Sequence, residues 1–328
     1  MRFGFIFDFR NPPKWQRPWA DFYVETLEFI AWLESIGFDA VWLAEHHGVE
    51  DGYMPSPLMI GAAIAARTSR MRISPGIAIA PFYHPVRLAE DIAILDNISG
   101  GRAELALGIG YRQTEADHYG ADFKARGRYT DELLQIVSRL LEGDEVTFKG
   151  EFFDLKGTRI FPLPIQKPRV PILVGGVARP GLRRAARFGD GLCGGVDEYP
   201  AYIEELRMLG RQDKPRLDST ADMWMMVSED PEHAFEDIAP HYCYQLAAYA
   251  KWQADTGWSF LPSDAEAIKN SGVFRVLTPN EAIALIRQRK AKVPQLESFC
   301  MMVPAGLPLS KLAEHAKLFA EKVMPAFR

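Results

Sequence analysis

The sequence predicts an α/β protein built as a TIM-type (β/α)8 barrel. Eight short apolar runs alternate along the 328 residues with segments whose apolar positions recur at helical spacing. Runs such as 103–109 (AELALGI) are apolar throughout, which is typical of parallel strands buried on both faces. A doubly wound open sheet shares this alternation, but eight units without an opening GxGxxG motif favour the barrel. We expect the whole chain, 1–328, to form one domain.

The first half of the chain supplies four strand–helix units. The predicted strands are 2–9, 39–44, 72–80 and 103–109, and the predicted helices are 21–36, 56–69, 85–98 and 128–142. Gly37 and the Gly100-Gly101 pair follow two of these helices, at the place where a left-handed residue is favoured. The strands are expected to run parallel, joined by right-handed crossovers.

The second half carries two insertions. Alternating, aromatic-rich pieces within 145–162 predict a hairpin before strand five, and 231–277 predicts a helical insertion between strands seven and eight. Thr278-Pro279-Asn280-Glu281 predicts a helix start with a capping box. The remaining predicted strands are 171–175, 190–194, 220–228 and 297–303, and the remaining helices are 180–188, 199–209 and a final segment that runs to the C-terminus.

Composition narrows the class of protein. The formal net charge is −5 and no basic stripe is present, which argues against nucleic acid as a partner. The three cysteines are far apart, so they predict neither a disulfide framework nor a thiolate metal site. The first residues lack the pattern of a signal peptide, and no apolar stretch is long enough to span a bilayer. We therefore expect a cytoplasmic protein with no membrane partner.

Polar residues follow predicted strand two, at the end of the barrel where chemistry is found in this fold. Glu45, His46 and His47 are consecutive there. Imidazole titrates near neutral pH, so it can act as an acid or a base without a large pKa shift. Adjacent residues of an extended segment point in opposite directions, so only one histidine faces the pocket. A hydrogen-bonded structural pair is the alternative, and the spacing is unlike that of a zinc motif.

Two glycine-containing loops follow later strands. Gly108 and Gly110 flank Ile109 after strand four, where they let the backbone approach a flat or phosphorylated ligand. After strand five, Gly175 and Gly176 precede Arg179 and a basic helix. Glycine N–H groups, a helix N-terminus and a guanidinium all favour an anion, and we predict a phosphate site there. Arg183, Arg184 and Arg187 are expected on a solvated helix face.

Three blocks together resemble the luciferase-like flavin monooxygenases. They are GFDAVWLAEHH, APFYHPVRLAEDIAILDNISGGRAELALGIGY and PILVGG followed by LRRAARFGDGL, in the family's order and spacing, and they cover roughly the first 195 residues. The resemblance implies a barrel that binds reduced FMN, or in a sister branch a reduced deazaflavin. It also implies a separate NAD(P)H-dependent flavin reductase as a transient partner.

The resemblance implies roles for particular residues. His46 matches the first histidine of the family's EHH motif, which is catalytic in luciferase, and Gly108, Ile109 and Gly110 match the loop beside the flavin. Ile109 stands where luciferase has a phosphate-contacting arginine, which moves the expected phosphate site to Gly175, Gly176 and Arg179. A cis peptide typical of the family maps to Gly76-Ile77, so that Ile77 would contact the flavin ring.

These features predict a monooxygenase that uses reduced FMN and O2 to oxidise a small, hydrophobic substrate. A deazaflavin-dependent dehydrogenase or reductase is the alternative, and a non-catalytic flavin-binding homologue is a third possibility. The small-residue helix at 61–66 (GAAIAA) predicts a homodimer. Residues 240–277 are expected to shape the substrate pocket and to act as a lid over the flavin.

Overall fold

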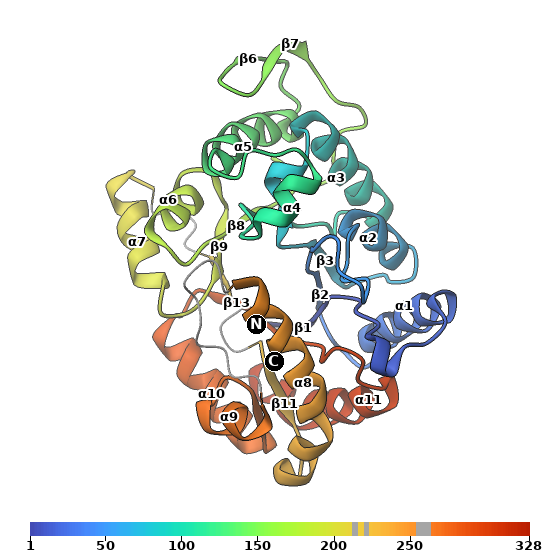
Figure 1. The fold of residues 1–328 in the computed structure, drawn as a ribbon. Coiled ribbons are helices and arrows are strands. Elements are labelled where there is room, and N and C mark those ends of the chain that lie inside the picture. Colours follow the sequence, from blue (N-terminus) through green and yellow to red (C-terminus); the bar gives the residue numbers. More distant parts are fainter. Residues whose placement is uncertain (212–215, 220–222, 254–263) are drawn as a thin grey trace.

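The structure, a computed structural model, describes residues 1–211, 216–219, 223–253 and 264–328. A nine-stranded sheet has the order β3-β2-β1-β13-β10-β9-β8-β5-β4, and every neighbouring pair is parallel. Its strands are β1 (Arg2–Phe7), β2 (Ala40–Leu43), β3 (Arg72–Pro75), β4 (Ala78–Ile79), β5 (Leu105–Gly108), β8 (Ile172–Gly175), β9 (Gly191–Gly194), β10 (Arg216–Ser219) and β13 (Leu296–Met302). The sheet curls into the predicted barrel with helices around it (Figure 1).

The predicted strand 72–80 is present as two pieces. β3 pairs with β2, and β4 pairs with β5, so the two ends of the sheet order are consecutive in the chain. A parallel bridge between Ile73 and Ala103 also joins β3 to the segment before β5. The barrel is therefore nearly closed. The Gly76-Ile77 peptide between the two pieces is cis, as the resemblance implied.

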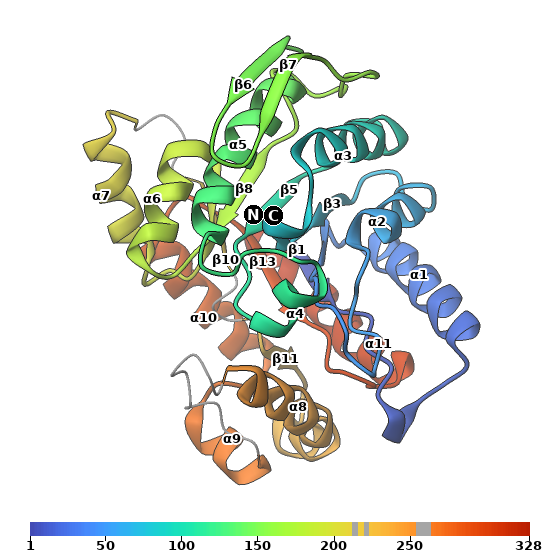
Figure 2. The same ribbon diagram turned by 45° about the horizontal axis from the view of Figure 1, so that its top comes forward.

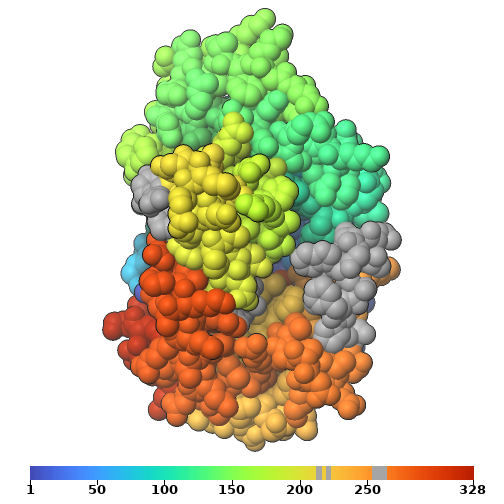
Figure 3. Space-filling view, turned by 90° about the vertical axis from the view of Figure 1, so that its left-hand side faces the viewer, coloured from blue at the N-terminus to red at the C-terminus, as the bar shows by residue number. Residues whose placement is uncertain are grey.

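Helices surround the barrel strands. They are α1 (Trp19–Ser35), α2 (Pro57–Ala65), α3 (Pro85–Ser99), α5 (Arg126–Glu142), α6 (Arg179–Phe188), α7 (Tyr199–Met208), α10 (Pro279–Lys292) and α11 (Leu309–Leu318). Helix α3 ends at Gly100, whose φ of 68° is left-handed, and α10 begins with the predicted capping box between Thr278 and Glu281. Helices α6, α7 and α10 lie together on one face of the molecule (Figure 3).

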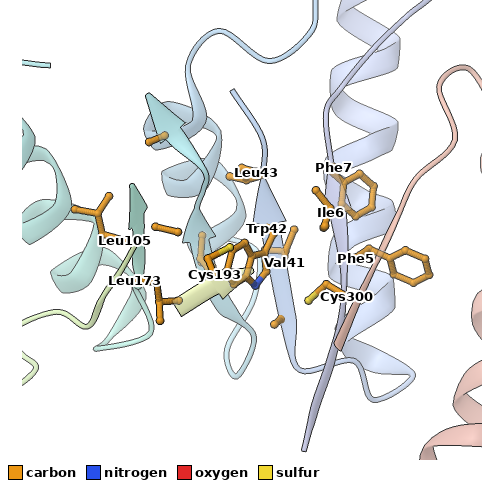
Figure 4. Packing of buried hydrophobic residues seen from close by; sticks show 14 of the residues in the cluster. Phe5, Ile6, Phe7, Val41, Trp42, Leu43, Leu105, Leu173, Cys193 and Cys300 are labelled. Carbon is orange, nitrogen blue, oxygen red and sulfur yellow. The ribbon is translucent and has the colours of Figure 1, made fainter. Parts of the chain in front are cut away.

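The core is continuous from the barrel interior to the inner faces of the helices. Apolar side chains of β1, β2, β5, β8, β9 and β13 gather between the strands (Figure 4). Phe5 and Phe7 of β1 alternate with Ile6, and all three are buried, as expected for a strand covered on both sides. This packing holds the carboxyl ends of the strands, and the loops that follow them, in fixed positions.

The opposite, amino-terminal end of the barrel holds a buried ion cluster. Glu104 accepts hydrogen bonds from Arg2 at 2.8 Å, from Arg72 at 3.3 Å and from Arg216 at 3.0 Å. Arg216 also donates to Asp218 at 2.6 Å. Burial alone would raise the pKa of Glu104, but the three arginines outweigh it and lower the pKa to about 2. These charges compensate one another, as buried ions must.

The prediction for strand seven was wrong. The barrel strand is β10 at 216–219, and 220–222 lie outside the described residues. The apolar run behind the prediction forms β11 (Met225–Val227), which pairs with β12 (Arg275–Leu277) in a separate two-stranded sheet. Residues 216–219 (RLDS) contain an ion pair between the partly buried Arg216 and the buried Asp218, so the sequence of the barrel strand is more polar than that of β11.

The remaining elements lie in the connections between barrel strands. β6 (Val146–Lys149) and β7 (Asp154–Thr158) pair as an antiparallel hairpin between α5 and β8. The sequence did not predict α4 (Gln113–His118). α8 (Pro231–Gln253) and α9 (Ala265–Ser271) lie between β11 and β12, and short helical turns occur at Pro13–Trp15, Ala80–Phe82, Phe319–Val323 and Met324–Phe327. No helix in the described ranges is both long and apolar enough to cross a membrane.

Candidate active site

His46 lies directly after β2, at the carboxyl end of the barrel, and its side chain is buried. Its Nδ1 lies 2.8 Å from Glu115 Oε1, and its Nε2 lies 3.1 Å from the hydroxyl of Tyr111. Burial lowers the pKa of His46, although Glu115 opposes the shift, so the ring is neutral at neutral pH. Since the carboxylate accepts from Nδ1–H, Nε2 is the acceptor atom.

Glu115 comes from the short helix α4 and collects three donors. Its Oε1 accepts from the ring of His46, from the backbone N–H of His47 at 2.8 Å and from Arg112 at 2.7 Å. Burial would raise the pKa of Glu115, but these donors and the charge of Arg112 lower it below its ordinary value. Its Oε2 is buried without a hydrogen-bond partner. An ionised Glu115 therefore fixes both the tautomer and the orientation of the His46 ring.

His47 faces a different set of groups, as the alternation of side chains predicted. Its Nε2 lies 2.9 Å from Glu45, and its Nδ1 lies 2.9 Å from the hydroxyl of Tyr119. Glu45 also accepts from the backbone N–H of Ile79 at 2.6 Å and from Tyr83 at 2.8 Å. Glu45 and His47 thus tie the end of β2 to β4, next to the Gly76-Ile77 peptide.

Aromatic rings from helix α8 and from the loop after β2 surround His46. The ring centroid of Tyr53 lies 4.7 Å from that of His46, Trp252 lies at 5.1 Å and Tyr249 at 6.3 Å. Arg112, which precedes α4, lies with its guanidinium carbon 4.5 Å from the centre of the Trp252 ring. Arg112 of the loop before α4 thus contacts Trp252 of α8, and these groups account for the burial of His46. Figure 2 shows α4 above α8.

Ile77 lies between the glycines that the sequence singled out. A Cβ atom at Gly108 would stand 2.5 Å from the Ile77 side chain, and one at Gly175 would stand 2.8 Å from it. Gly110 has a φ of 70° and approaches Ile79. Both glycines beside Ile77 are therefore required for its side chain to fit. Ile77 remains only partly buried, at the carboxyl end of the barrel.

The expected phosphate ligand is placed differently. Arg179 is the first residue of α6 rather than a loop residue, and it donates to Glu205 of α7 at 2.9 Å. Its side chain is 64% exposed, and Arg183 donates to the same carboxylate at 3.0 Å. The N–H of Gly176 is directed at Cys193 O, at 3.4 Å. The predicted helix began at residue 180, so Arg179 was expected in the loop before it. That expectation was wrong, because α6 begins one residue earlier.

Sequence reasoning missed Glu115 and Arg10. Arg10 is buried after β1 and pairs with Asp51 at 2.7 Å. The rule that selected His46 would also have selected Arg10, since both follow a strand at its carboxyl end. Glu115 has a weaker signal, namely its i,i+3 spacing from Arg112. No group of three or more metal-ligating side chains occurs in the described part of the chain.

The family model for luciferase-like monooxygenases matches residues 1–284. The chain belongs to the luciferase-like monooxygenase family. Limonene 1,2-monooxygenase of Rhodococcus erythropolis is 26% identical over 316 residues, which is 92% of this chain and 81% of the relative. The oxygenase component of the trigonelline monooxygenase of Acinetobacter baylyi is 31% identical over 161 residues. That match covers 48% of this chain and 44% of the relative, so the chain spans less than half of it.

This chain is also similar to an F420-dependent enzyme. The F420-dependent glucose-6-phosphate dehydrogenase of Kineococcus radiotolerans is 30% identical over 64% of this chain and 66% of that one. Among solved structures, monooxygenase RslO1 of Streptomyces bottropensis superimposes with a TM-score of 0.85 at 24% identity, over the full length of both chains. The oxygenating constituent of 3,6-diketocamphane monooxygenase of Pseudomonas putida, a complex with FMN, superimposes with a TM-score of 0.77 at 18% identity, over 99% of this chain and 98% of that one.

Proposed function

We propose that this chain is a flavin-dependent monooxygenase that uses reduced FMN and O2 to oxidise a small, apolar organic substrate. The observation that carries the proposal is the buried, neutral His46, whose tautomer is fixed by Glu115 at the carboxyl end of the barrel. The family supports it, and so do the relatives, several of which are monooxygenases. A deazaflavin-dependent hydride transfer is the second candidate; an F420-dependent relative is similar to this chain, but the oxygenase relatives favour the first candidate.

The residues at the barrel mouth fit a flat ring system. Ile77 is apolar and partly exposed, and the glycines at 108 and 175 keep its surroundings free of other side chains. We infer that Gly76, Ile77, Gly108, Ile109 and Gly110 line the ring. The flavin, when bound, supplies the electrons that activate oxygen. Helix α8 and its aromatic rings would exclude water from this space.

His46 is the proposed catalytic residue. Its Nε2 accepts from Tyr111 in this structure, and it can accept or return a proton when a substrate or cofactor atom takes the place of that hydroxyl. Glu115 positions the ring and stabilises the imidazolium while the proton is held. His47 and Glu45 hold the end of β2 in place and have no direct part in this transfer.

The phosphate is proposed to lie at the N-terminus of α6, beside Gly175 and Gly176. The N-terminus of α6 favours an anion because the helix dipole is positive there, while Pro180 has no N–H and the N–H of Gly181 donates to Ala178 O at 2.8 Å. Arg179 would join the site only by leaving Glu205, which now holds it. Reduced flavin would come from a separate reductase. The relative described as an oxygenase component supports this division of labour.

We also propose a homodimer formed through α2 and α3. Met59 of α2 is 73% exposed, and Ile94 and Ile98 of α3 are 44% and 49% exposed. Phe161 and Ile165 are also exposed, and they lie on a segment held to α3 by hydrogen bonds from Asn97 to Leu163 O and from Gln166 to Asp96. Large apolar side chains exposed on elements that pack together are typical of an interface between copies.

The test is cofactor binding followed by turnover. The chain is expected to bind FMN and, with an NADH-dependent flavin reductase, to incorporate one oxygen atom of O2 into an oxidisable substrate, which mass spectrometry with labelled O2 would detect. In the His46→Ala variant, we expect turnover to fall by about 10²–10⁴-fold, the usual effect of losing a general acid–base group, while FMN affinity changes by less than about threefold.

The matched control is His84→Ala, because His84 is exposed at the start of α3, where its ring packs on Phe153. It should leave turnover unchanged. Unaltered turnover in His46→Ala would remove His46 from the mechanism. Binding of the deazaflavin with no binding of FMN would replace the proposal by its second candidate.

A further inference from the structure

Arg10 is a buried cation with one donor group unused. It follows β1, which pairs with β2, so it lies at the same end of the barrel as His46. Its side chain is 1% exposed, and its Nε donates to Asp51 at 2.7 Å. Its Nη1 is buried and has no hydrogen-bond partner. Buried N–H groups are almost always paired, so this one calls for an acceptor that the described residues do not supply.

The guanidinium shares its aromatic surroundings with His46. Its carbon lies 5.4 Å from the ring centre of Tyr53 and 5.6 Å from that of Trp252, both of which also contact His46. Tyr244 lies at 5.0 Å as a third ring. A ligand that packs against Tyr53 and Trp252 would therefore be in reach of both the arginine and the histidine.

The charges around Arg10 favour a neutral acceptor over an anion. Asp51 already pairs with the guanidinium and also accepts from Tyr244 at 2.8 Å. Asp8 accepts from the backbone N–H of Arg10 at 3.2 Å and from the side-chain amide of Gln245 at 3.1 Å. Since Asp51 already balances the charge of the guanidinium, a further full negative charge would have no free cation to pair with, whereas a carbonyl oxygen would satisfy Nη1.

We propose that Arg10 binds a carbonyl oxygen on an otherwise apolar substrate, whose carbon skeleton packs against Tyr53 and Trp252 next to His46. This inference rests on the proposed function, because it names the substrate class of the same site. It assigns Arg10 to substrate recognition, and it separates ketones, esters and amides from plain hydrocarbons of equal shape.

The test compares two probes of matched shape, acetophenone and α-methylstyrene, in which the carbonyl oxygen is replaced by a methylene group. Calorimetry on the wild-type chain should show acetophenone binding about tenfold more tightly, the usual effect of one charged hydrogen bond. Arg10→Lys keeps a cation for Asp51 but loses the forked second nitrogen. It should reduce the preference to within about twofold and leave the affinity for α-methylstyrene unchanged.

Arg184→Lys is the control, because Arg184 is also a buried arginine paired with an aspartate, Asp131, but lies on α6. It should keep the tenfold preference. Equal binding of the two probes by the wild type, or no binding of either at millimolar concentration, would overturn the proposal even if Arg10→Lys does not fold. A preference for acetophenone in a chain that neither binds flavin nor consumes O2 would keep the carbonyl site and remove the proposed function.

Discussion

The imidazole of His46 carries its proton on Nδ1 because that nitrogen faces Glu115 at 2.8 Å. Burial and the carboxylate act in opposite directions on this ring, since burial lowers the pKa of His46 and the negative charge raises it. The balance keeps the ring neutral and ready to accept a proton at Nε2. Glu115 supplies the charge that raises the pKa of His46, and it can be substituted while the histidine is kept.

Glu115→Gln should retain the hydrogen bond to Nδ1 but remove the charge. The pKa of His46 should then fall further, because the group that raises it is gone, and turnover should fall about tenfold or more. The acid limb of the pH–rate profile should move to lower pH. A lower turnover number with an unshifted profile would show that Glu115 only supports the fold of α4.

The raised pKa of Asp8 can be tested through the pH dependence of the unfolding free energy. Burial, opposed by Arg10, raises the pKa of Asp8 to about 7 from a model-peptide value of 3.8. A raised folded-state pKa gives stability that is present below pH 3.8 and is lost as pH rises toward 7. Relative to Asp8→Asn, the wild type should therefore lose up to about 1.4 kcal/mol of unfolding free energy per pH unit in that window.

Urea titrations of both proteins at pH 5 and pH 7.5 measure this difference. A constant difference across the two pH values would mean that Asp8 is ionised throughout.

The sequence predicted His46 because it follows an apolar strand directly. It could not predict Glu115 or the pairing of Arg179, since both depend on where a short helix begins and which helix packs beside it.

At the scale of elements, the sequence predicted the strands whose side chains are apolar throughout and missed the one that holds an ion pair. β10 contains Arg216 and Asp218, and a charged strand is recognisable only when its buried partner Glu104 is known. The expectation that residues 240–277 act as a lid also needs revision. Residues 240–253 belong to α8, where Tyr242 and Leu246 are fully buried, while 254–263 lie outside the described residues.

Helix α8 should therefore behave as part of the core in the ligand-free protein. Tyr242 donates to Met302 O of β13 at 3.1 Å, and Tyr249 and Trp252 pack near His46. Hydrogen exchange should show the backbone amides of 240–253 protected to a degree similar to that of α5. Exchange as fast as that of an open loop would restore the original expectation of a lid over the whole segment.

At the scale of the molecule, the exposed apolar side chains on α2 and α3 predict a mass twice the 36.9 kDa of one chain. Light scattering at micromolar concentration should give this dimer mass. Ile98→Glu should shift it toward the monomer, because a charge buried in an apolar interface is costly. Val24→Glu is the control, since Val24 is 54% exposed but lies on α1. A monomer in the wild type would contradict the proposal.

The pairing of β11 with β12 has a consequence for how the sequence of this molecule can vary. Val227 pairs with Leu277, so the segment between them begins and ends at neighbouring points of this separate two-stranded sheet after some fifty residues. The intervening segment carries Tyr244, Tyr249 and Trp252, which surround Arg10 and His46, whereas both of those residues belong to the barrel. Changes within this segment would therefore alter the surroundings of Arg10 and His46 while the strands that precede both residues stay in place.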